Sequence, residues 1–401
     1  METTFIPYPK AQSIIKKHTG NFSIETKNLE EAIGSYLAED LIADRDFPPF
    51  NRVTMDGIAI LFDSFKNGQK SFTIAGVAAA GSAQQSLKNA EHCIEVMTGA
   101  ILPKGVDTVI RYEDITIENQ QATINVSTVK DQQNVHFKGM DMAQGATIVS
   151  KGKKVSSAEI TIAATIGKAQ LKVRKLPKTI IFSTGNELVP VSETPQPHQI
   201  RRSNSYGIQA SLKEWGIYAD LQHLPDDKEK MFTEISSLLD TYDLFIFSGG
   251  VSKGKYDYLP EVLEKLQVKK HFHKVQQRPG KPFWFGTTEH KKTIFALPGN
   301  PVSSFVCTYV YVKKWLELSL TIPQEKIYVS LKTEVTFKPD LVYFLQAKLE
   351  SGVDGKLIAE PVKGNGSGDF INLVHADGFL MLPQGKNIFK KGEVFEFIMY
   401  R

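Results

Sequence analysis

Residues 243–254 read DLFIFSGGVSKG, and this stretch decides the fold of the central part of the chain. The apolar residues 244–247 predict a buried strand, and apolar residues at helical spacing resume at 258–266. Between them, glycines and serines form a turn whose backbone N–H groups are expected to face an anion. A strand, a glycine-rich turn and a helix in this order are typical of a phosphate-binding corner in an open α/β sheet.

Two more glycine-rich turns follow. The stretch 278–282 (RPGKP) precedes a strand-like run at 283–285, and 298–301 (PGNP) follows an apolar run at 293–297. One such turn is a weak signal, but three at the ends of predicted strands indicate a binding site for a polyanion. Its candidate residues are Ser248, Gly249, Gly250, Val251, Ser252, Arg278, Lys281, Pro298, Gly299, Asn300, Pro301 and Ser303.

Upstream of these turns the chain alternates strands and helices. The runs 179–182 and 217–221 predict strands, and Ser203-Asn204-Ser205 is expected to cap a helix between them. A second helix is expected over 226–240, with Asp226 and Asp227 at its positive end. Such alternation implies a parallel sheet with helices on both faces.

The flanking regions differ from this central part. Short β-rich runs fill residues 70–130 and resume near residue 322, and helices are expected at 28–39 and 157–167. The predicted fold class is therefore multidomain, α/β plus β. It comprises a central doubly wound α/β domain (1–22 with 177–321), a linking α+β domain (23–45 with 146–176), an inserted small β domain (46–145) and a C-terminal β domain (322–401).

The composition of the chain narrows the class of protein to which it can belong. Its 401 residues are 41% hydrophobic and 23% charged, which is ordinary for a globular protein, and a net charge of +4 argues against bulk nucleic-acid binding. Cys93 and Cys307 lie far apart and form no metal-binding pattern. Met1 to Lys10 has no apolar core, so we expect no signal peptide, and no apolar run approaches about twenty residues. We expect a cytoplasmic protein without nucleic-acid or membrane partners.

Several segments, in a fixed order, together resemble the molybdopterin molybdenumtransferase family, which comprises bacterial MoeA and the E-domain of gephyrin. They are FPPFNRVTMDGIAI (47–60), EVMTGAILPKGVDTVI (95–110), STGNEL (183–188), RRSNSYGIQA (201–210), SGGVSKGKYDY (248–258), PGKPFWFG (279–286) and LPGNPVS (297–303). The resemblance implies that the central α/β domain binds molybdopterin. It also implies a homodimer of elongated, four-domain subunits with an active site shared between them.

The implied reaction inserts molybdenum from molybdate into adenylylated molybdopterin and releases AMP, in molybdenum cofactor biosynthesis. Mg²⁺ is the implied cofactor, and a transient contact with the adenylyltransferase that makes the substrate is expected. Carried over by motif, the catalytic residues are Asp56, Thr98, Asp141, Glu187, Asp227, Asp257 and Lys281. Further substrate-binding positions are Ser183, Thr184, Gly185, Ser203, Asn204 and Ser205.

The chemistry of these residues agrees with that reaction. Glu187 and Asp257 follow predicted strands of one sheet and are the candidate Mg²⁺ ligands, because Mg²⁺ prefers carboxylate oxygens. Lys281, Arg278 and Lys253 are expected to neutralise a pyrophosphate. Asp56, in an early segment and without an expected local partner, fits a site shared across a dimer.

The chain departs from the family pattern at a few motif positions. Asn51, Arg52 and Val53 replace the usual acidic and serine residues, and Ile58 replaces an aromatic residue. Arg278 replaces a common lysine, and Arg202 replaces a common acid or amide. These departures leave the reaction class in place and bear on the choice between molybdate and tungstate.

Three alternative functions share parts of this pattern. A molybdopterin adenylyltransferase has similar Ser-Gly-Gly and Pro-Gly-Asn-Pro turns, and a competence-damage-type hydrolase has a similar α/β unit. The Met-Asp-Gly segment and the β-rich tail argue against the adenylyltransferase. A non-enzymatic, gephyrin-like scaffold is the third alternative, but no sequence feature marks a peptide groove.

Overall fold

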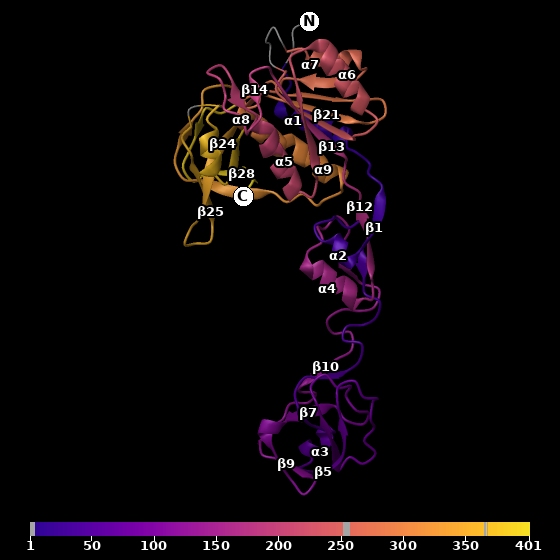
Figure 1. Cartoon of the computed structure of the whole chain (residues 1–401). Helices are drawn as coiled ribbons and strands as arrows, with labels where there is room; N and C mark the ends of the chain where they lie inside the picture. The colour runs from indigo at the N-terminus through magenta and orange to yellow at the C-terminus, as the bar shows by residue number, and fades with distance from the viewer. Residues whose placement is uncertain (1–4, 252–256, 365, 367) are drawn as a thin grey trace. The chain divides into compact units, whose positions relative to one another are not determined.

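The computed structural model describes residues 5–251, 257–364, 366 and 368–401. The chain forms two compact units (Figure 1). The larger unit comprises Met1–Ala38, Lys151–Ser156 and Lys172–Arg401, and the smaller unit comprises Glu39–Ser150 and Ser157–Leu171. The finer division into four domains stays a prediction. Among the described residues, no helix combines the length and apolar character needed to cross a membrane.

The central sheet of the larger unit has six strands in the order β16-β13-β17-β21-β20-β18. They are β13 (Thr179–Thr184), β16 (Ala219–Leu224), β17 (Leu244–Ser248), β18 (Lys269–His273), β20 (Trp284–Thr287) and β21 (Thr293–Leu297). The first four in this order are parallel, as predicted, whereas β20 runs antiparallel to β21 and β18 antiparallel to β20. Trp284 at the start of β20 pairs with Ala296 near the end of β21, so the preceding turn lies at the carboxyl edge of the parallel strands.

Helices cover both faces of this sheet, as predicted (Figure 1). Ile181 and Ile246 pack in a core with α1, α5, α8 and α9, whereas Phe182 and Phe247 pack in a core with α6 and α7. Successive residues of each strand thus face opposite layers, as the period of a strand requires. The helices are α1 (Tyr8–Lys17), α5 (Asn204–Glu214), α6 (Lys228–Leu238), α7 (Leu259–Lys265), α8 (Pro301–Cys307) and α9 (Lys313–Ser319).

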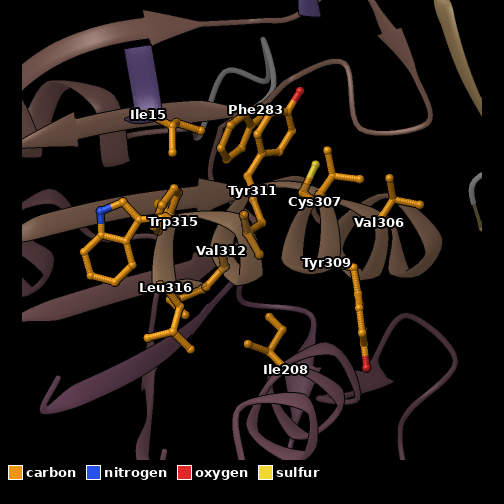
Figure 2. Close-up of a cluster of buried hydrophobic side chains, with 14 of the residues drawn as sticks. Ile15, Ile208, Phe283, Val306, Cys307, Tyr309, Tyr311, Val312, Trp315 and Leu316 are labelled. Atoms are coloured by element: carbon orange, nitrogen blue, oxygen red, sulfur yellow. The ribbon is translucent and has the colours of Figure 1, made fainter. Parts of the chain in front are cut away.

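A π-helical segment, η2 (Thr308–Val312), joins α8 to α9 without a break. Figure 2 shows the buried side chains around it, including Tyr311, Phe283 and Cys307. The rings of Tyr311 and Phe283 stack with centroids 4.2 Å apart. Single π-helical turns are frequent near functional sites because they redirect side chains within a helix. Here the turn lies in the core directly behind the 278–282 loop.

The C-terminal strands form a second six-stranded sheet, in the order β19-β24-β25-β22-β28-β26, with an additional β24–β26 pairing that closes five strands into a ring. Its strands are β19 (Gln277–Arg278), β22 (Ile327–Leu331), β24 (Val342–Ser351), β25 (Leu357–Pro361), β26 (Gly378–Leu382) and β28 (Val394–Met399). Nearby lie β23 (Val335–Thr336), β27 (Ile388–Phe389) and the 3-10 helix η3 (Phe370–Val374). The β-rich tail is confirmed, but β19 comes from the α/β region and was not predicted to join it.

The smaller unit is built on a six-stranded sheet in the order β7-β4-β6-β5-β9-β8. The strands are β4 (Gly57–Ile60), β5 (Ser71–Ala78), β6 (His92–Val96), β7 (Thr108–Arg111), β8 (Ile115–Glu118) and β9 (Gln121–Ile124). Ala59 packs in one core while Ile58 and Ile60 pack in another, so both faces of β4 are buried. The unit also contains β2 (Leu41–Ile42), β3 (Arg52–Val53), β10 (Val135–His136), β11 (Thr147–Val149), α3 (Phe62–Lys66), η1 (Tyr112–Asp114) and α4 (Ser157–Thr165).

The helix expected over residues 28–39 is wrong in its length. Only α2 (Leu29–Ala32) is helical, and Gly34 adopts a φ of +78° that ends the helical path. Tyr36 and Leu37 then form bridges with Lys154 and Val173 instead of continuing a helix. The remaining short strands are β1 (Ile24–Asn28), β12 (Gln170–Arg174), β14 (Leu188–Val189) and β15 (Ile200–Arg201).

Candidate functional site

The carboxyl edge of the central sheet opens into a cavity of about 1050 Å³. The turns after β13, β17 and β21, the turn before β20, the start of α5 and part of β24 line it. All of these elements belong to the larger unit. The cavity brings together most of the predicted residues, namely Ser183, Thr184, Gly185, Glu187, Ser203, Asn204, Ser205, Ser248, Gly249, Gly250, Val251, Asp257, Arg278, Lys281, Pro298, Gly299, Asn300, Pro301 and Ser303.

The turn after β17 is packed too tightly for side chains. Gly249 and Gly250 have φ values of +100° and +73°, which favour glycine. A Cβ atom on Gly249 would lie 2.7 Å from Oγ1 of Thr184, at the end of the neighbouring strand. The N–H group of Gly249 donates to the carbonyl oxygen of Leu297 at 3.0 Å, so this N–H group is not directed at a ligand as expected.

Asn204 ties two of the turns together. Its side-chain Nδ2 donates to Ser248 Oγ at 3.0 Å and to the carbonyl oxygen of Gly299 at 2.7 Å. The helix begins where Ser203-Asn204-Ser205 was expected to cap it, with Ser203 at the N-cap position of α5, but the Ser203 side chain makes no capping hydrogen bond. The first turn of α5 instead fixes the spacing between the turns after β17 and β21.

The turn that carries Lys281 is held from the core. Gln277 is fully buried, and its Nε2 donates to the carbonyl oxygens of Pro279 at 3.1 Å and Gly280 at 3.3 Å. The Oε1 atom of Gln277 accepts a hydrogen bond from the hydroxyl of Tyr311. Burial raises the pKa of Tyr311 well above its usual value, so this hydroxyl keeps its proton.

Lys281 itself is exposed at the end of this rigid turn. Its carbonyl oxygen accepts hydrogen bonds from Val275 N and Phe283 N, each at 3.0 Å. Its ammonium nitrogen lies 4.3 Å from the centre of the Phe5 ring. The backbone of Lys281 is therefore fixed, while its charge remains accessible to a ligand in the cavity.

Arg202 carries an unsatisfied donor beside the same cavity. Its Nε atom is buried and has no hydrogen-bond partner in the described structure. The pKa of the neighbouring His223 lies below its usual value. Burial is the main cause and Arg202 also lowers this pKa, whereas the hydrogen bond to Ser183 O acts in the opposite direction. A buried donor without an acceptor is unfavourable, so this atom marks a position where a ligand oxygen would be stabilised.

Carboxylates lie on the cavity wall as well. Glu187, Asp226 and Asp257 all line the cavity, and Asp226 Oδ2 accepts a hydrogen bond from Asn186 N at 3.3 Å. Within the described ranges, no three His, Cys, Asp or Glu side chains form a cluster that would hold a metal. Mg²⁺ is commonly bound by one or two carboxylates, with waters and substrate phosphates completing the shell. Glu187 and Asp257 fit an ion held in that shared way.

Three predicted site residues of the larger unit, Asp227, Ser252 and Lys253, are not among the described residues that line the cavity. Asp227 is the N-cap of α6, and its Oδ1 accepts hydrogen bonds from Glu229 N at 3.1 Å and Lys230 N at 3.0 Å. This confirms the predicted helix start, and the catalytic role of Asp227 stays a prediction. Ser252 and Lys253 lie outside the described residues.

The smaller unit places Asp56 beside Thr98. Asp56 Oδ1 accepts a hydrogen bond from Thr98 N at 2.5 Å. Hydrogen bonds from the backbone and then the side chain of Thr98 hold the pKa of Asp56 below its usual value. The expectation that Asp56 has no local partner is therefore wrong. Its role in catalysis stays a prediction.

Asp141, in the same unit, is held through an imidazole. His136 Nε2 donates to Asp141 Oδ1 at 2.8 Å, and Arg52 Nη2 donates to His136 Nδ1 at 3.1 Å. Because a guanidinium group only donates, His136 carries its proton on Nε2 in this arrangement. Arg52 is one of the departures from the family pattern, and its contact with His136 was not predicted.

Four residues of the larger unit were missed as site residues by sequence reasoning. Arg202 was noted only as a departure. Gln277 gave no signal although it directly precedes the RPGKP motif, and His223, whose Nδ1 lies 3.0 Å from Ser183 O, gave none either. Gln346 on β24 also lines the cavity, and its Nε2 is buried without a partner in the described structure. Nothing in the β-rich tail marks this glutamine.

Comparison with family models covers nearly the whole chain. The model described as the MoeA N-terminal region (domain I and II) matches residues 6–167. The model of a probable molybdopterin binding domain matches residues 180–318, and that of the MoeA C-terminal region (domain IV) matches residues 328–400. The cavity is lined by residues within the last two of these matches.

Relatives of similar length carry one name. A molybdopterin molybdenumtransferase of Synechocystis sp. is 42% identical over 390 residues, spanning 96% of this chain and 98% of the relative. Its counterpart in Staphylococcus epidermidis is 31% identical over 395 residues, spanning 96% of this chain and 93% of the relative. The crystal structure of a molybdopterin biosynthesis moeA protein from Pyrococcus horikosii has a TM-score of 0.82 at 28% identity, covering 99% of this chain and 100% of the other.

Proposed function

Because the chain belongs to the MoeA family of molybdopterin molybdenumtransferases, we propose that it inserts molybdenum from molybdate into adenylylated molybdopterin and releases AMP. One observation carries the proposal. The turns at three parallel strand ends, the buried unpartnered donor of Arg202 and the exposed Lys281 all line one cavity. This combination suits a ligand with several anionic oxygens at one end.

The residues of the cavity have distinct tasks in this reaction. Arg202, Arg278 and Lys281 would hold the pyrophosphate and the molybdate, which are both oxyanions and need hydrogen-bond donors and positive charge. Asn204 keeps the turns after β17 and β21 at a fixed spacing and so orients the phosphates. Charge neutralisation and alignment account for the reaction without a side-chain nucleophile.

We assign the magnesium site to Glu187 and Asp257. Both line the cavity with the phosphate-binding turns, which supports an ion shared with the substrate. When bound, Mg²⁺ supplies a Lewis acid that polarises the phosphoryl oxygens. The two carboxylates would hold the ion on the side of the cavity formed by the turns after β13 and β17.

We further propose a homodimer with a shared site. Asp56, Thr98 and Asp141 belong to the smaller unit, whereas the larger unit alone builds the cavity. A site that combines the larger unit of one subunit with the smaller unit of its partner would use both sets of residues. A cytoplasmic location and a transient contact with the adenylyltransferase complete the proposal.

The test is a reconstitution with purified protein, adenylylated molybdopterin, molybdate and Mg²⁺. The expected result is AMP release that depends on both molybdate and Mg²⁺, together with a product that activates a molybdenum-free apoenzyme. A second reaction supplies molybdopterin and ATP without molybdate. Adenylylation in that second reaction, with no AMP release in the first, would show an adenylyltransferase instead.

A further inference from the structure

The lining of the cavity comes from two regions of the chain. The turns at the carboxyl edge of the central sheet contribute glycines and cationic groups, and β24 with the segment after β25 contributes the rest, with Arg278 of β19 paired beside β24. There the chain contributes Leu341, Phe344 and Val362, which are apolar, and Gly364, which has no side chain. Cavities with apolar walls and a few polar groups usually take the organic part of a ligand.

Gln346 is the amide side chain that β24 contributes to the lining. It is 9% exposed, and its Nε2 atom has no hydrogen-bond partner among the described residues. The backbone N–H of Val362 donates to Gln346 O at 2.9 Å, so Gln346 and Val362 are neighbours on adjoining segments. A Cβ atom on Gly364 would lie 3.0 Å from Asn372 Nδ2 and 3.7 Å from both Asp369 Oδ2 and Gln346 Oε1, so the chain beside the amide is closely packed.

A buried amide donor without an acceptor is unfavourable for folding. A methionine or leucine would fill a buried position on β24 without that penalty. Because Gln346 lines the cavity, the unpaired Nε2 indicates an acceptor that arrives with the ligand. An uncharged amide is a weaker partner for a phosphate oxygen than the guanidinium and ammonium groups that line the same cavity, so a neutral acceptor fits this position better.

We propose that Gln346 is a specificity-determining residue that donates through Nε2 to a ring acceptor of a planar heterocycle in the substrate. The inference rests on the proposed function, in which the substrate carries two such groups, adenine and the pterin. Both have ring nitrogens that accept hydrogen bonds, and either would extend from the phosphate turns towards β24. The shared chemistry is recognition of the edge of a neutral heterocycle.

The experiment measures binding to the full chain by calorimetry, with AMP, ribose 5-phosphate, pterin and inorganic pyrophosphate as separate probes. The variants are Gln346→Met, which conserves volume, and Gln346→Glu, which replaces the donor by an acceptor. Gln384→Met is the matched control, because Gln384 lies outside the cavity wall and its amide donates to Asp340. Thermal unfolding of each variant verifies folding.

Both Gln346 variants are expected to raise the Kd of one ring-containing probe about three- to tenfold, the usual range for a neutral hydrogen bond. A change confined to AMP assigns the acceptor to adenine, and a change confined to pterin assigns it to the pterin. With Gln346→Met, which adds no charge, ribose 5-phosphate and pyrophosphate, which lack the heterocycle, should bind with unchanged affinity. Gln384→Met should alter none of the four.

Unchanged affinity for both AMP and pterin in the folded Gln346→Met variant would overturn the inference. An equal loss for pyrophosphate in Gln346→Met would also overturn it, because the change would then affect the whole cavity. The proposed function is tested separately by AMP release from the wild-type chain. A wild type that inserts molybdenum while Gln346→Met binds every probe normally would remove this inference and leave the proposed function in place.

Discussion

The buried hydroxyl of Tyr311 donates a hydrogen bond to Oε1 of Gln277, and the other end of the same amide holds the turn that carries Lys281. Tyr311 belongs to the π-helical segment between α8 and α9 and stacks on Phe283, which follows the turn (Figure 2). The position of an exposed cation is thus fixed by a buried polar pair. Changes at Tyr311 would reach the cavity through Gln277.

Lys281→Ala is expected to weaken molybdate or phosphate binding about ten- to hundredfold, because a charge-assisted hydrogen bond contributes about 1.5–3 kcal/mol. The free energy of unfolding should change by no more than about 0.5 kcal/mol, since the side chain is exposed. Molybdate dependence of AMP release and thermal unfolding are measured on one preparation. Lys213→Ala, an exposed lysine at the end of α5, is the control. Unchanged molybdate dependence would show that Lys281 is only a solvent-exposed residue of the turn and does not bind the anion.

Glu187→Gln and Asp257→Asn are each expected to raise the magnesium concentration needed for half-maximal activity, because each removes a charged oxygen ligand. Both residues lie outside helices and strands, so the fold should remain intact. Magnesium titrations of AMP release measure the effect, with Asp240→Asn, an exposed carboxylate near the end of α6, as the control. A wild-type titration curve for both variants would contradict the assignment.

Mixed dimers of an Asp56→Ala subunit and a Lys281→Ala subunit are expected to recover part of the activity that each variant lacks alone. If the site is shared, one of the two sites in the mixed dimer contains both intact residues. If each site lies within one subunit, both sites carry a defect. Dimers purified through two different affinity tags are assayed for AMP release. Absence of rescue in verified mixed dimers would rule out a shared site.

Gly249→Ala is expected to lower the free energy of unfolding by about 1–3 kcal/mol, the usual range for a strained backbone position. The φ of +100° disfavours a side chain, and the new Cβ would lie 2.7 Å from Thr184 Oγ1. Gly207→Ala is the matched control, because Gly207 lies in α5 with no heavy atom within 4 Å of an added Cβ. It should stabilise the helix by about 0.5–1 kcal/mol. Denaturant titrations of both variants distinguish these opposite signs.

The stability of the larger unit is expected to fall on acidification through the His18–His271 pair, whose nitrogens lie 3.0 Å apart. Burial, then His18 and Lys269, lowers the pKa of His271 from 6.5 to about 4. The unfolded chain therefore takes up this proton at higher pH than the folded chain. The contribution of neutral His271 to the free energy of unfolding is therefore complete above pH 6.5 and is lost as the pH falls towards 4.

Denaturant titrations of the wild type and His271→Gln across that range provide the measurement. The variant should show a shallower loss of stability with falling pH, because the titrating group is gone. His290→Gln, at an exposed position in the loop between β20 and β21, serves as the control. Parallel pH profiles for the wild type and His271→Gln would contradict the role of the pair.

The order of strands and helices in the central sheet was predictable because its elements are short apolar runs separated by glycine and proline. The run 244–247 and the turn after it illustrate this, since burial and backbone strain both act locally. Residues 28–39 were not predictable in the same way. Apolar residues there recur at helical spacing, but Tyr36 and Leu37 bridge to distant segments, and a periodicity gives no information on such partners.

The cavity was predictable at the glycine turns and much less so elsewhere. Asn204 was expected as part of a helix cap and as a substrate-binding position, but not as an amide that spans two turns far apart in sequence. Gln277 and Gln346 are buried glutamines, and sequence alone does not separate a buried glutamine from an exposed one. Their roles depend on tertiary contacts that no local pattern encodes.

The pairing of β19 with β24 limits how the chain can be recombined. Gln277 and Arg278 lie within the match to the molybdopterin-binding model, but they pair with Val342 and Tyr343 from the C-terminal region. A chimera that exchanged residues 328–400 between relatives would keep β19 from one parent and β24 from the other. The β19–β24 pairing next to Lys281 would then combine side chains that come from different parents. Functional chimeras should therefore transfer residues 277–278 together with the C-terminal region.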